Sequence, residues 1–288
     1  MRVRVAEGKV AGVQRLAKSI ARLLLVGAAV VSLTWVALVV FIWRTQESLL
    51  FFPTQLPPDA VLSTDPQVHE RWVDVDGARL SLLQMQLPDP DGVVFFLHGN
   101  GGSLQNWFVD PSLYRQANFD LVMLDYRGYG KSSGQIESEA QLHNDVLQVW
   151  EHIAPQYRDM PVVIYGRSLG TGLAARLATT VQPELTVLVS PYVSMRELAA
   201  HYYPWLPGAV LRYPMRTDQW LGHIDGPVLI FHGSKDSLIP PRHAQDLAAL
   251  SARARLVLLD GAAHDDVHVF DEYRNTLKES LRSLVQSN

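Results

Sequence analysis

The stretch from Val162 to Gly172 constrains the fold of this chain more than any other segment. It starts with Val-Val-Ile-Tyr, an apolar and mostly β-branched run that is typical of a strand covered on both faces of a sheet. Ser168 follows between Gly166 and Gly170, and the residues after it suit a helix. Because glycines let a strand and a helix approach closely, the pattern predicts a sharp turn that exposes the serine hydroxyl, as in a G-x-S-x-G nucleophile elbow.

The G-x-S-x-G pattern occurs a second time, and only the surrounding residues distinguish the two serines. In Gly130–Gly134 the serine, Ser132, follows a glycine-rich loop, several residues after a predicted strand that ends at Asp125. The next helix begins later, at a capping box that starts with Ser138. Ser168 is flanked directly by a strand and a helix. We therefore expect Ser168 to be the nucleophile and Ser132 to be a loop residue.

An uncharged stretch near the N-terminus predicts a membrane anchor. Leu23 to Ile42 are twenty consecutive residues without a charge, and a helix of that length spans about 30 Å, the thickness of a bilayer core. Basic residues dominate the segment before it, so we expect a cytoplasmic N-terminus and a domain on the opposite, periplasmic, lumenal or extracellular side. A cleaved signal peptide is the alternative, although the stretch is long for one and no small-x-small cleavage site follows it.

The chain is expected to have four regions: a basic cytoplasmic N-terminus (residues 1–22), a single transmembrane anchor (23–43), a connector (44–70) and a main α/β domain (71–288). The connector contains the apolar run Leu49–Phe52, followed by prolines. This run could pack on the domain or lie in the membrane interface.

Strand and helix patterns alternate over the rest of the chain. The predicted strands are Arg71–Asp74, Arg79–Gln84, Val93–Leu97, Leu121–Asp125, Val162–Tyr165, Thr186–Val189, Val228–Phe231 and Arg255–Leu259. The predicted helices are Gln105–Gln116, Ser138–Ile153, Leu169–Val181, Arg242–Ser251 and Val267–Gln286. Asp76-Gly77 is a hairpin signal between the first two strands, whereas the later strands are apolar throughout. The pattern predicts an α/β fold with a mostly parallel, eight-stranded sheet and helices on both faces.

The longest interruption of this pattern runs from Pro191 to Gly226 and is rich in tyrosine, tryptophan and proline. Loops of this length in compact domains usually have a function. We expect a small lid (residues 191–226) over an apolar substrate pocket. The alternative is a surface excursion whose aromatic side chains only pack on the domain.

Two residues, each following a later predicted strand, are expected to complete a catalytic triad with Ser168. Asp236 follows the predicted strand 228–231, and His264 follows the predicted strand 255–259. The carboxyl ends of parallel strands meet at one edge of a sheet, and the chain order nucleophile, acid, histidine is the order of this kind of fold. We expect His264 to take the proton of Ser168 and return it to the leaving group, and Asp236 to orient the imidazole.

These side chains could also have roles outside a triad. Asp236 could cap the following helix, and Asp225 is the nearest other acid, but Asp225 precedes its strand and points to the wrong end of the sheet. His264 could be an ordinary loop residue or a helix cap. His264 and His268 have the i,i+4 spacing of a zinc pair, but no HExxH pattern is present, so we expect no metal.

A glycine-rich loop after the third predicted strand, His98–Ser103, is the expected partner of Ser168 in binding an oxyanion. The backbone N–H of Leu169, directly after the nucleophile, is one predicted donor, and the N–H of Asn100 is the second. The alternative is a tight strand-to-helix turn without a catalytic role. A phosphate-binding loop is disfavoured because no G-x-x-x-x-G-K-[ST] pattern occurs.

Composition narrows the possible chemistry. The chain has no cysteine, which excludes disulfides, a thiol nucleophile and thiolate metal sites. Its net charge is −4 without a long charge run, so nothing suggests a nucleic-acid partner. No cofactor is expected, and the expected partners are an acyl ester or lipid substrate and the membrane.

Five segments carry a resemblance to a known family: His98–Gly102, Asp125–Ser132, Tyr165–Gly170, Gly233–Asp236 and Gly261–His264. With these segments in this order, the chain resembles the α/β-hydrolase superfamily of serine hydrolases, and within it the membrane-anchored, small-lid branch of α/β-hydrolase-domain proteins. The resemblance extends from about Phe51 to the C-terminus and implies hydrolysis of carboxylic esters or thioesters. Lysophospholipid lipases, protein depalmitoylases, esterases and peptidases are among such relatives, and this chain lacks the cysteine cluster that anchors the depalmitoylases.

Three functions follow from these observations. A membrane-anchored hydrolase of hydrophobic acyl esters is the first. A serine peptidase of the same fold is the second, and would need a larger cap to select peptides. A non-catalytic interaction protein is the third, and would have no reason to keep Ser168, Asp236 and His264 together.

Overall fold

The computed structural model describes residues 2–108 and 111–286, with side chains described from Arg15 onward except at Ala17. The predicted basic segment 1–22 and the predicted helix 105–116 therefore lie partly outside the described residues. The chain divides into two compact units, the first ending at Gln46 and the second beginning at Glu47.

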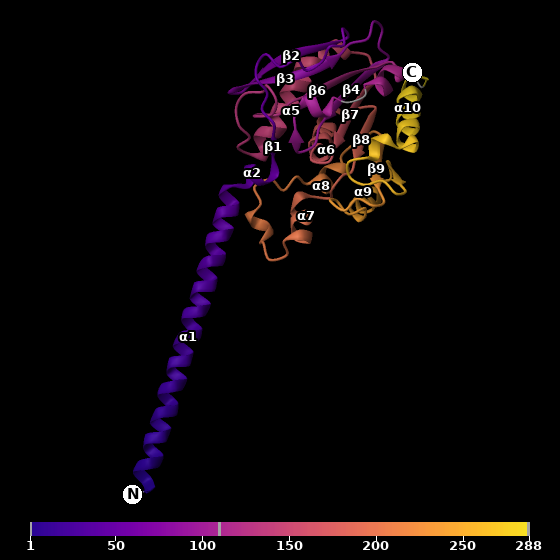
Figure 1. Ribbon diagram of the computed structural model, residues 1–288. Helices are drawn as coiled ribbons and strands as arrows, with labels where there is room; N and C mark the ends of the chain where they lie inside the picture. Colours follow the sequence, from indigo (N-terminus) through magenta and orange to yellow (C-terminus); the bar gives the residue numbers. More distant parts are fainter. Residues whose placement is uncertain (1, 109–110, 287–288) are drawn as a thin grey trace. The chain divides into compact units, whose positions relative to one another are not determined.

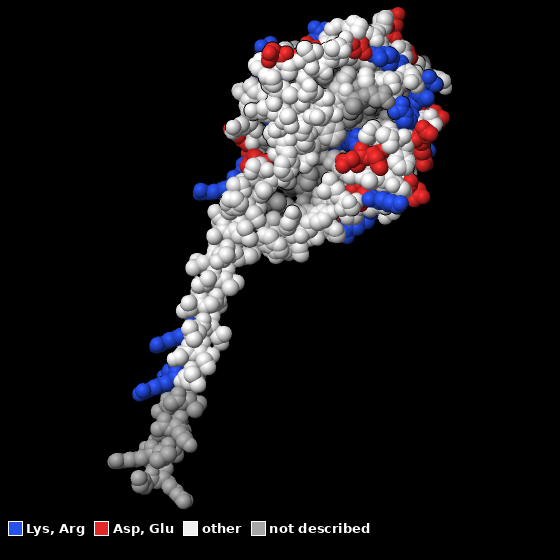
Figure 2. All heavy atoms as spheres, viewed as in Figure 1, with Lys and Arg blue, Asp and Glu red and all other residues white. Residues whose placement is uncertain are grey.

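The first unit is one long helix, α1 (Arg2–Arg44). From Lys18 to Arg44 it is long and apolar enough to cross a membrane, with a mean hydropathy of 2.6 in its most apolar 18-residue window and no part of that window buried. Between the basic residues at its beginning, blue in Figure 2, and Arg44 at its end, this stretch has no charged side chain. An isolated helix that is apolar on all sides is typical of a membrane span.

The second unit is built on an eight-stranded sheet (Figure 1) with the order β10-β9-β8-β7-β4-β6-β3-β2. The strands are β2 (Val68–Val75), β3 (Ala78–Met85), β4 (Gly92–Leu97), β6 (Phe119–Leu124), β7 (Val162–Arg167), β8 (Leu185–Val189), β9 (Val228–Gly233) and β10 (Ala254–Leu259). All pairs are parallel except those made by β3, which is antiparallel to both β2 and β6. The prediction of a mostly parallel, eight-stranded sheet is confirmed.

Helices cover both faces of the sheet. The helices of the second unit are α2 (Gln46–Leu50, which begins one residue earlier), α3 (Leu104–Trp107), α4 (Ser112–Ala117), α5 (Glu139–Ile153), α6 (Gly170–Val181), α7 (Met195–Tyr202), α8 (Thr217–Leu221), α9 (Arg242–Leu250) and α10 (Asp271–Gln286). Apolar residues of α5, α6 and α9 pack in one core cluster, and those of α3, α4 and α10 pack in the other. Burying the sheet on both faces explains why its central strands are apolar throughout.

Several elements differ from the sequence-based expectation. The predicted helix 105–116 consists of two short helices, α3 and α4, and the predicted helix 267–286 begins as a 3₁₀ turn (Val267–Val269) before α10. An additional two-stranded parallel sheet joins β1 (Phe52–Pro53) to β5 (Gly101–Gly102). Segment 191–226 contains α7, a 3₁₀ turn (Gly208–Val210) and α8.

Candidate active site

The turn between β7 and α6 holds Ser168 in a strained conformation. Its φ is 51°, in the left-handed region that non-glycine residues seldom adopt. A Cβ atom at Gly166 would lie 2.4 Å from the carbonyl oxygen of Gly170, and one at Gly170 would lie 2.0 Å from that of Leu97. Only glycines fit these two positions, so the G-x-S-x-G spacing is a steric requirement of the turn.

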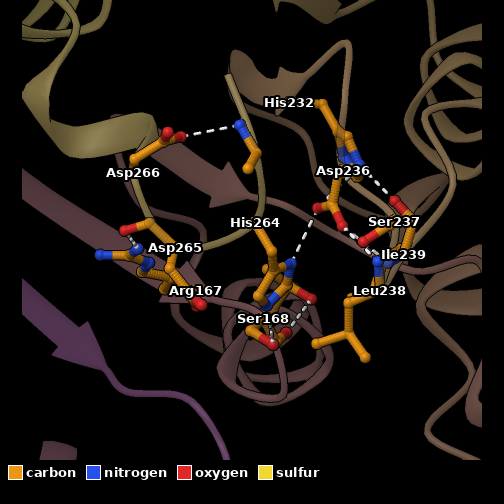
Figure 3. A network of polar contacts seen from close by, with 12 residues as sticks. Arg167, Ser168, His232, Asp236, Ser237, Leu238, Ile239, His264, Asp265 and Asp266 are labelled. Carbon is orange, nitrogen blue, oxygen red and sulfur yellow. Dashed lines mark hydrogen bonds and ion pairs between the residues drawn. The ribbon is translucent and has the colours of Figure 1, made fainter. Parts of the chain in front are cut away.

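His264 lies between Ser168 and Asp236 and is hydrogen-bonded to both (Figure 3). Its Nδ1 is 2.8 Å from Oδ2 of Asp236, and its Nε2 is 3.0 Å from Oγ of Ser168. A carboxylate can only accept, so Nδ1–H donates to Asp236 and Nε2 is left to accept the serine O–H. The structure brings together the three residues expected to form a triad, in the arrangement that general-base activation of a serine needs.

The surroundings of Asp236 keep it ionised. Its Oδ1 accepts hydrogen bonds from the N–H groups of Leu238 (2.9 Å) and Ile239 (2.8 Å). Burial alone would raise the pKa of Asp236, but hydrogen bonds from His232, His264 and the Ile239 N–H together hold this pKa below its ordinary value. An ionised Asp236 can stabilise the imidazolium that forms when His264 takes a proton.

Two N–H groups beside Ser168 have no acceptor within the described part of the chain, those of Asn100 and Leu169. The loop after β4 lies against Ser168, because a Cβ at Gly99 would be 3.5 Å from Cβ of Ser168. Both predicted oxyanion donors thus belong to segments that flank the serine, and both N–H groups remain free to bind a developing negative charge.

Ser132, which is expected to be a loop residue, and two buried histidines make structural contacts. Ser132 lies in a loop, where its Oγ donates to the carbonyl of Asp125 (2.7 Å) and accepts the N–H of Ser81 (2.8 Å). His98 contacts the carbonyl of Gly99 through Nδ1 (2.7 Å), and His232 contacts that of Ile239 through Nε2 (2.8 Å). These side chains fix the loops around the triad.

His264 and His268 do not form a metal pair. Both ring nitrogens of His264 are engaged with Asp236 and Ser168, and Nδ1 of His268 is 3.4 Å from the guanidinium of Arg167. Across the described residues, no group of three or more potential ligands is arranged to hold a metal ion.

Sequence reasoning missed Arg167, which joins the elbow to the histidine loop. Its guanidinium donates to the carbonyl of Asp265 (2.8 Å) and lies over the ring of Trp107, 5.4 Å from the centroid. The signal was the position itself, since Arg167 directly precedes the nucleophile. It positions the loop that carries His264.

Sequence reasoning also missed how segment 191–226 and the connector reach the site. In segment 191–226, the hydroxyl of Tyr202 donates to the carbonyls of Ser237 (2.7 Å) and Leu238 (2.9 Å), directly after Asp236. In the connector, the N–H of Phe52 donates to the carbonyl of Asn100 (3.0 Å). Neither contact follows from a local pattern, because each joins segments distant in sequence.

Comparisons with known proteins agree with this geometry. The sequence family described as serine aminopeptidase, S33, matches residues 88–222. An uncharacterized protein of Mycobacterium tuberculosis is 30% identical over 254 residues, which cover 84% of this chain and 89% of that protein. The lysophosphatidylserine lipase ABHD12 of Danio rerio is 31% identical over 188 residues, covering 57% of this chain and 48% of the lipase.

Solved structures share the fold at low sequence identity. An esterase of Pyrococcus furiosus superposes with a TM-score of 0.65 at 18% identity, covering 81% of this chain and 97% of the esterase. The fold, the family match and a relative aligned along most of both chains agree with one another. The chain belongs to the α/β-hydrolase superfamily of serine hydrolases, and resembles its α/β-hydrolase-domain branch.

Proposed function

We propose that this protein is a membrane-anchored serine hydrolase that cleaves carboxylic ester or thioester bonds of hydrophobic acyl substrates. The observation that carries the proposal is the continuous hydrogen-bond path from Ser168 through His264 to Asp236. A serine hydroxyl without such a base is a poor nucleophile, and this path supplies the base and its orienting acid.

The proposed reaction has two halves. In the first, Oγ of Ser168 attacks the carbonyl carbon while His264 Nε2 takes the serine proton, and the N–H groups of Asn100 and Leu169 bind the resulting oxyanion. His264 then donates that proton to the leaving alcohol or thiol, and an acyl-serine remains. In the second half, His264 takes a proton from water, which attacks the acyl-serine, and returns the proton to Oγ as the acid leaves.

The exposed apolar side chains of the lid favour an acyl chain as the substrate. Tyr203 and Trp205 in the lid are exposed, as is Leu238 beside the triad acid, and the Tyr202 hydroxyl joins the lid to that same loop. Exposed aromatic and aliphatic side chains near a catalytic serine suit an apolar chain better than a charged peptide. The lysophosphatidylserine lipase among the relatives acts on a lipid, which agrees with this substrate class.

The N-terminal helix supplies the proposed membrane attachment. We propose that residues 23–43 remain as a single-pass anchor, with residues 1–22 in the cytoplasm, residues 44–70 as the connector and the catalytic domain on the opposite side. The length and hydropathy of α1 and the basic residues that precede its apolar part support this topology.

Peptide hydrolysis is the second candidate, because the matching sequence family is described as a serine aminopeptidase. The triad chemistry would be the same, so substrate selection must distinguish the two functions. Purified full-length protein is expected to hydrolyse monoacylglycerols, lysophospholipids or short thioesters and to leave aminopeptidase substrates uncleaved. Cleavage of peptides without any ester hydrolysis would reverse the assignment.

Labelling with a fluorophosphonate probe tests the nucleophile directly. Wild-type protein and the Ser132→Ala variant are expected to be labelled, and the Ser168→Ala variant is not. Ser132→Ala is a matched control, since Ser132 is the serine of the second G-x-S-x-G pattern. A folded wild-type protein that reacts with no probe would leave only the non-catalytic role.

A further inference from the structure

The connector forms part of the framework around the candidate oxyanion loop. β1 pairs in parallel with β5, so that Phe52 lies opposite Gly101 and Pro53 lies opposite Gly102. The N–H of Phe52 donates to the carbonyl of Asn100 (3.0 Å), and the N–H of Thr54 donates to that of Gly102 (2.8 Å). The short segment after the apolar helix is therefore hydrogen-bonded to the loop that carries the Asn100 donor.

Asn100 is held by three hydrogen bonds that leave its N–H free. Its carbonyl accepts the N–H of Phe52 and also the hydroxyl of Tyr129 (2.6 Å). Its side-chain amide donates to the carbonyl of Leu50 (3.3 Å). Two of these three contacts come from the connector. Together they fix the side chain of Asn100 and the peptide plane that follows it, and so restrict the residue whose N–H lies on the preceding peptide.

The loop needs such support because glycine dominates its sequence. Gly99, Gly101 and Gly102 surround Asn100, and Gly102 has φ of 82°. Glycine has more accessible backbone conformations than any other residue, so a loop rich in glycine loses its geometry readily when external contacts are removed. Oxyanion donors act through their preorganisation, which makes this geometry a direct determinant of rate.

The connector is itself fixed to the domain. The carbonyl of Thr54 accepts the N–H of Gly130 (2.9 Å), and the N–H of Leu56 donates to the carbonyl of Gly130 (2.8 Å). The Phe51 ring is 4% exposed and packs edge-on against Tyr213, with ring centroids 5.2 Å apart. These contacts hold β1 in a fixed position on the domain.

Glu47 extends this attachment to the lid. Its carboxylate is 2.7 Å from the guanidinium of Arg212, and its Oε1 accepts the Tyr213 hydroxyl at 2.7 Å. One stretch of about ten residues thus contacts the lid, the loop at Gly130 and the oxyanion loop.

We propose that residues Leu50–Thr54 are a positioning segment for the oxyanion hole: they hold the peptide of Asn100 in the orientation in which its N–H binds the transition state. The proposal rests on the proposed function, because it assigns this role for the same Ser168 chemistry. It predicts that weakening the β1–β5 contact lowers kcat and leaves the KM of the ester nearly unchanged, since the contact affects a donor used mainly in the transition state.

The test uses the full-length protein and an ester substrate. Phe52→Pro removes the N–H that donates to Asn100 and is expected to lower kcat at least about tenfold, towards the roughly 100- to 1,000-fold cost of losing one oxyanion donor. Phe52→Leu retains the N–H and is expected to lose far less. Val61→Pro is the control for introducing proline, because Val61 is exposed and its N–H donates no hydrogen bond within the described residues.

A second variant avoids any dependence on the folding of the proline variant. Asn100→Ala keeps the backbone N–H at an exposed position and removes only the side-chain bond to Leu50. It is expected to lower kcat by roughly threefold to tenfold, within the range of one net hydrogen bond, and to lower the melting temperature by no more than about 2–4 °C. Fluorophosphonate labelling should slow in parallel, since the probe also needs the oxyanion donors.

The outcomes separate this proposal from the function on which it rests. A wild-type protein without ester hydrolysis contradicts the proposed function. If the wild-type protein hydrolyses the ester, and if Phe52→Pro and Asn100→Ala fold and keep the wild-type kcat, the positioning role alone is overturned. A rise in KM without a fall in kcat also overturns it, because the segment would then contact the substrate.

Discussion

Single residues decide the chemistry of this site, and Asp236 shows how. Its carboxylate is buried, and it accepts backbone N–H groups on one oxygen and an imidazole N–H on the other. These bonds favour the ionised form against the cost of burial, so the side chain remains a fixed negative charge beside His264. The same interactions hold Asp236, His264 and the loop between residues 236 and 239 in one geometry.

Replacing Asp236 with asparagine tests its orienting role. An amide at this position can donate to Nδ1 of His264, which would leave the proton on Nε2 and remove the acceptor for Ser168. We expect kcat to fall about 10⁴-fold with little change in KM, as for loss of the acid in other serine triads. Steady-state kinetics on an ester provide the measurement, and a variant that keeps more than a tenth of the activity would exclude Asp236 as the triad acid.

Because His243 is buried, we expect the folded protein to lose stability in acid. This side chain is fully buried in α9, and burial, followed by the charges of Arg242 and His232, lowers its pKa to about 4. The unfolded chain takes up this proton near pH 6.5, so the stabilisation from neutral His243 is complete above that pH and is lost as pH falls from about 6.5 to 4.

We therefore expect His243→Gln to show a weaker fall in melting temperature between pH 7 and pH 4.5 than the wild type. His69→Gln, at an exposed position, is the control and should follow the wild-type curve. Identical pH dependence of all three proteins would show that His243 is not the titrating group.

At the scale of elements, the elbow between β7 and α6 depends on close backbone approach. The carbonyl of Leu97 at the end of β4 lies where a Cβ of Gly170 would be, so β4, β7 and α6 meet without room for one methyl group. This contact brings the candidate oxyanion loop after β4 next to Ser168 after β7.

Gly170→Ala is expected to destabilise the protein by about 3 kcal/mol or more, because the added methyl overlaps backbone that cannot move without shifting β4. Gly222→Ala is the matched control: no atom lies within 4 Å of its added Cβ, and its φ is −68°. It should be neutral or slightly stabilising. Urea denaturation of both variants measures the difference, and equal midpoints would contradict the steric account.

The elements differ in how well their sequences predict them. The cap of α5 was predictable, and Ser138 does accept the N–H of Gln141 there (3.1 Å). The order of Ser168, Asp236 and His264 after their strands predicted which side chains meet, because parallel strands present their carboxyl ends together. β1 was not predictable, since two residues carry no alternation, and its partner lies about fifty residues away in a glycine-rich loop. The break between α3 and α4 was missed although the sequence marks it, because Pro111 lies inside the predicted helix 105–116 and is the N-cap of α4.

At the scale of the whole molecule, the chain combines an apolar helix with a compact α/β unit that begins only a few residues later. Sequence alone predicted both parts. The first is an uncharged stretch of twenty residues, and the second is a regular alternation of strand and helix patterns. Both patterns extend over many residues, so tertiary contacts seldom override them. The contacts between the connector and the loop at Asn100 form only in the folded domain. No long pattern in the sequence predicts them.

Membrane attachment predicts how the protein fractionates. Val31→Arg places a charge near the middle of the apolar stretch, which costs roughly 2.5–3.5 kcal/mol for insertion on the biological scale. We expect wild-type protein to remain with membranes after alkaline carbonate extraction and a larger share of the variant to be released. Leu49→Arg, beyond the stretch, serves as the control; equal release of all three proteins would contradict a transmembrane anchor.

The pairing of β1 with the loop at Gly101 has a consequence for proteolytic release of the domain. If α1 anchors the protein as proposed, a protease that cuts before Glu47 would release a domain that keeps β1 in its own chain. A cut at the exposed residues near Val61 would instead leave β1 on the membrane side of the cut, held to the domain only by its hydrogen bonds and by the packing of Phe51. The position of the cut, within about fifteen residues, therefore decides whether β1 stays covalently part of the released domain.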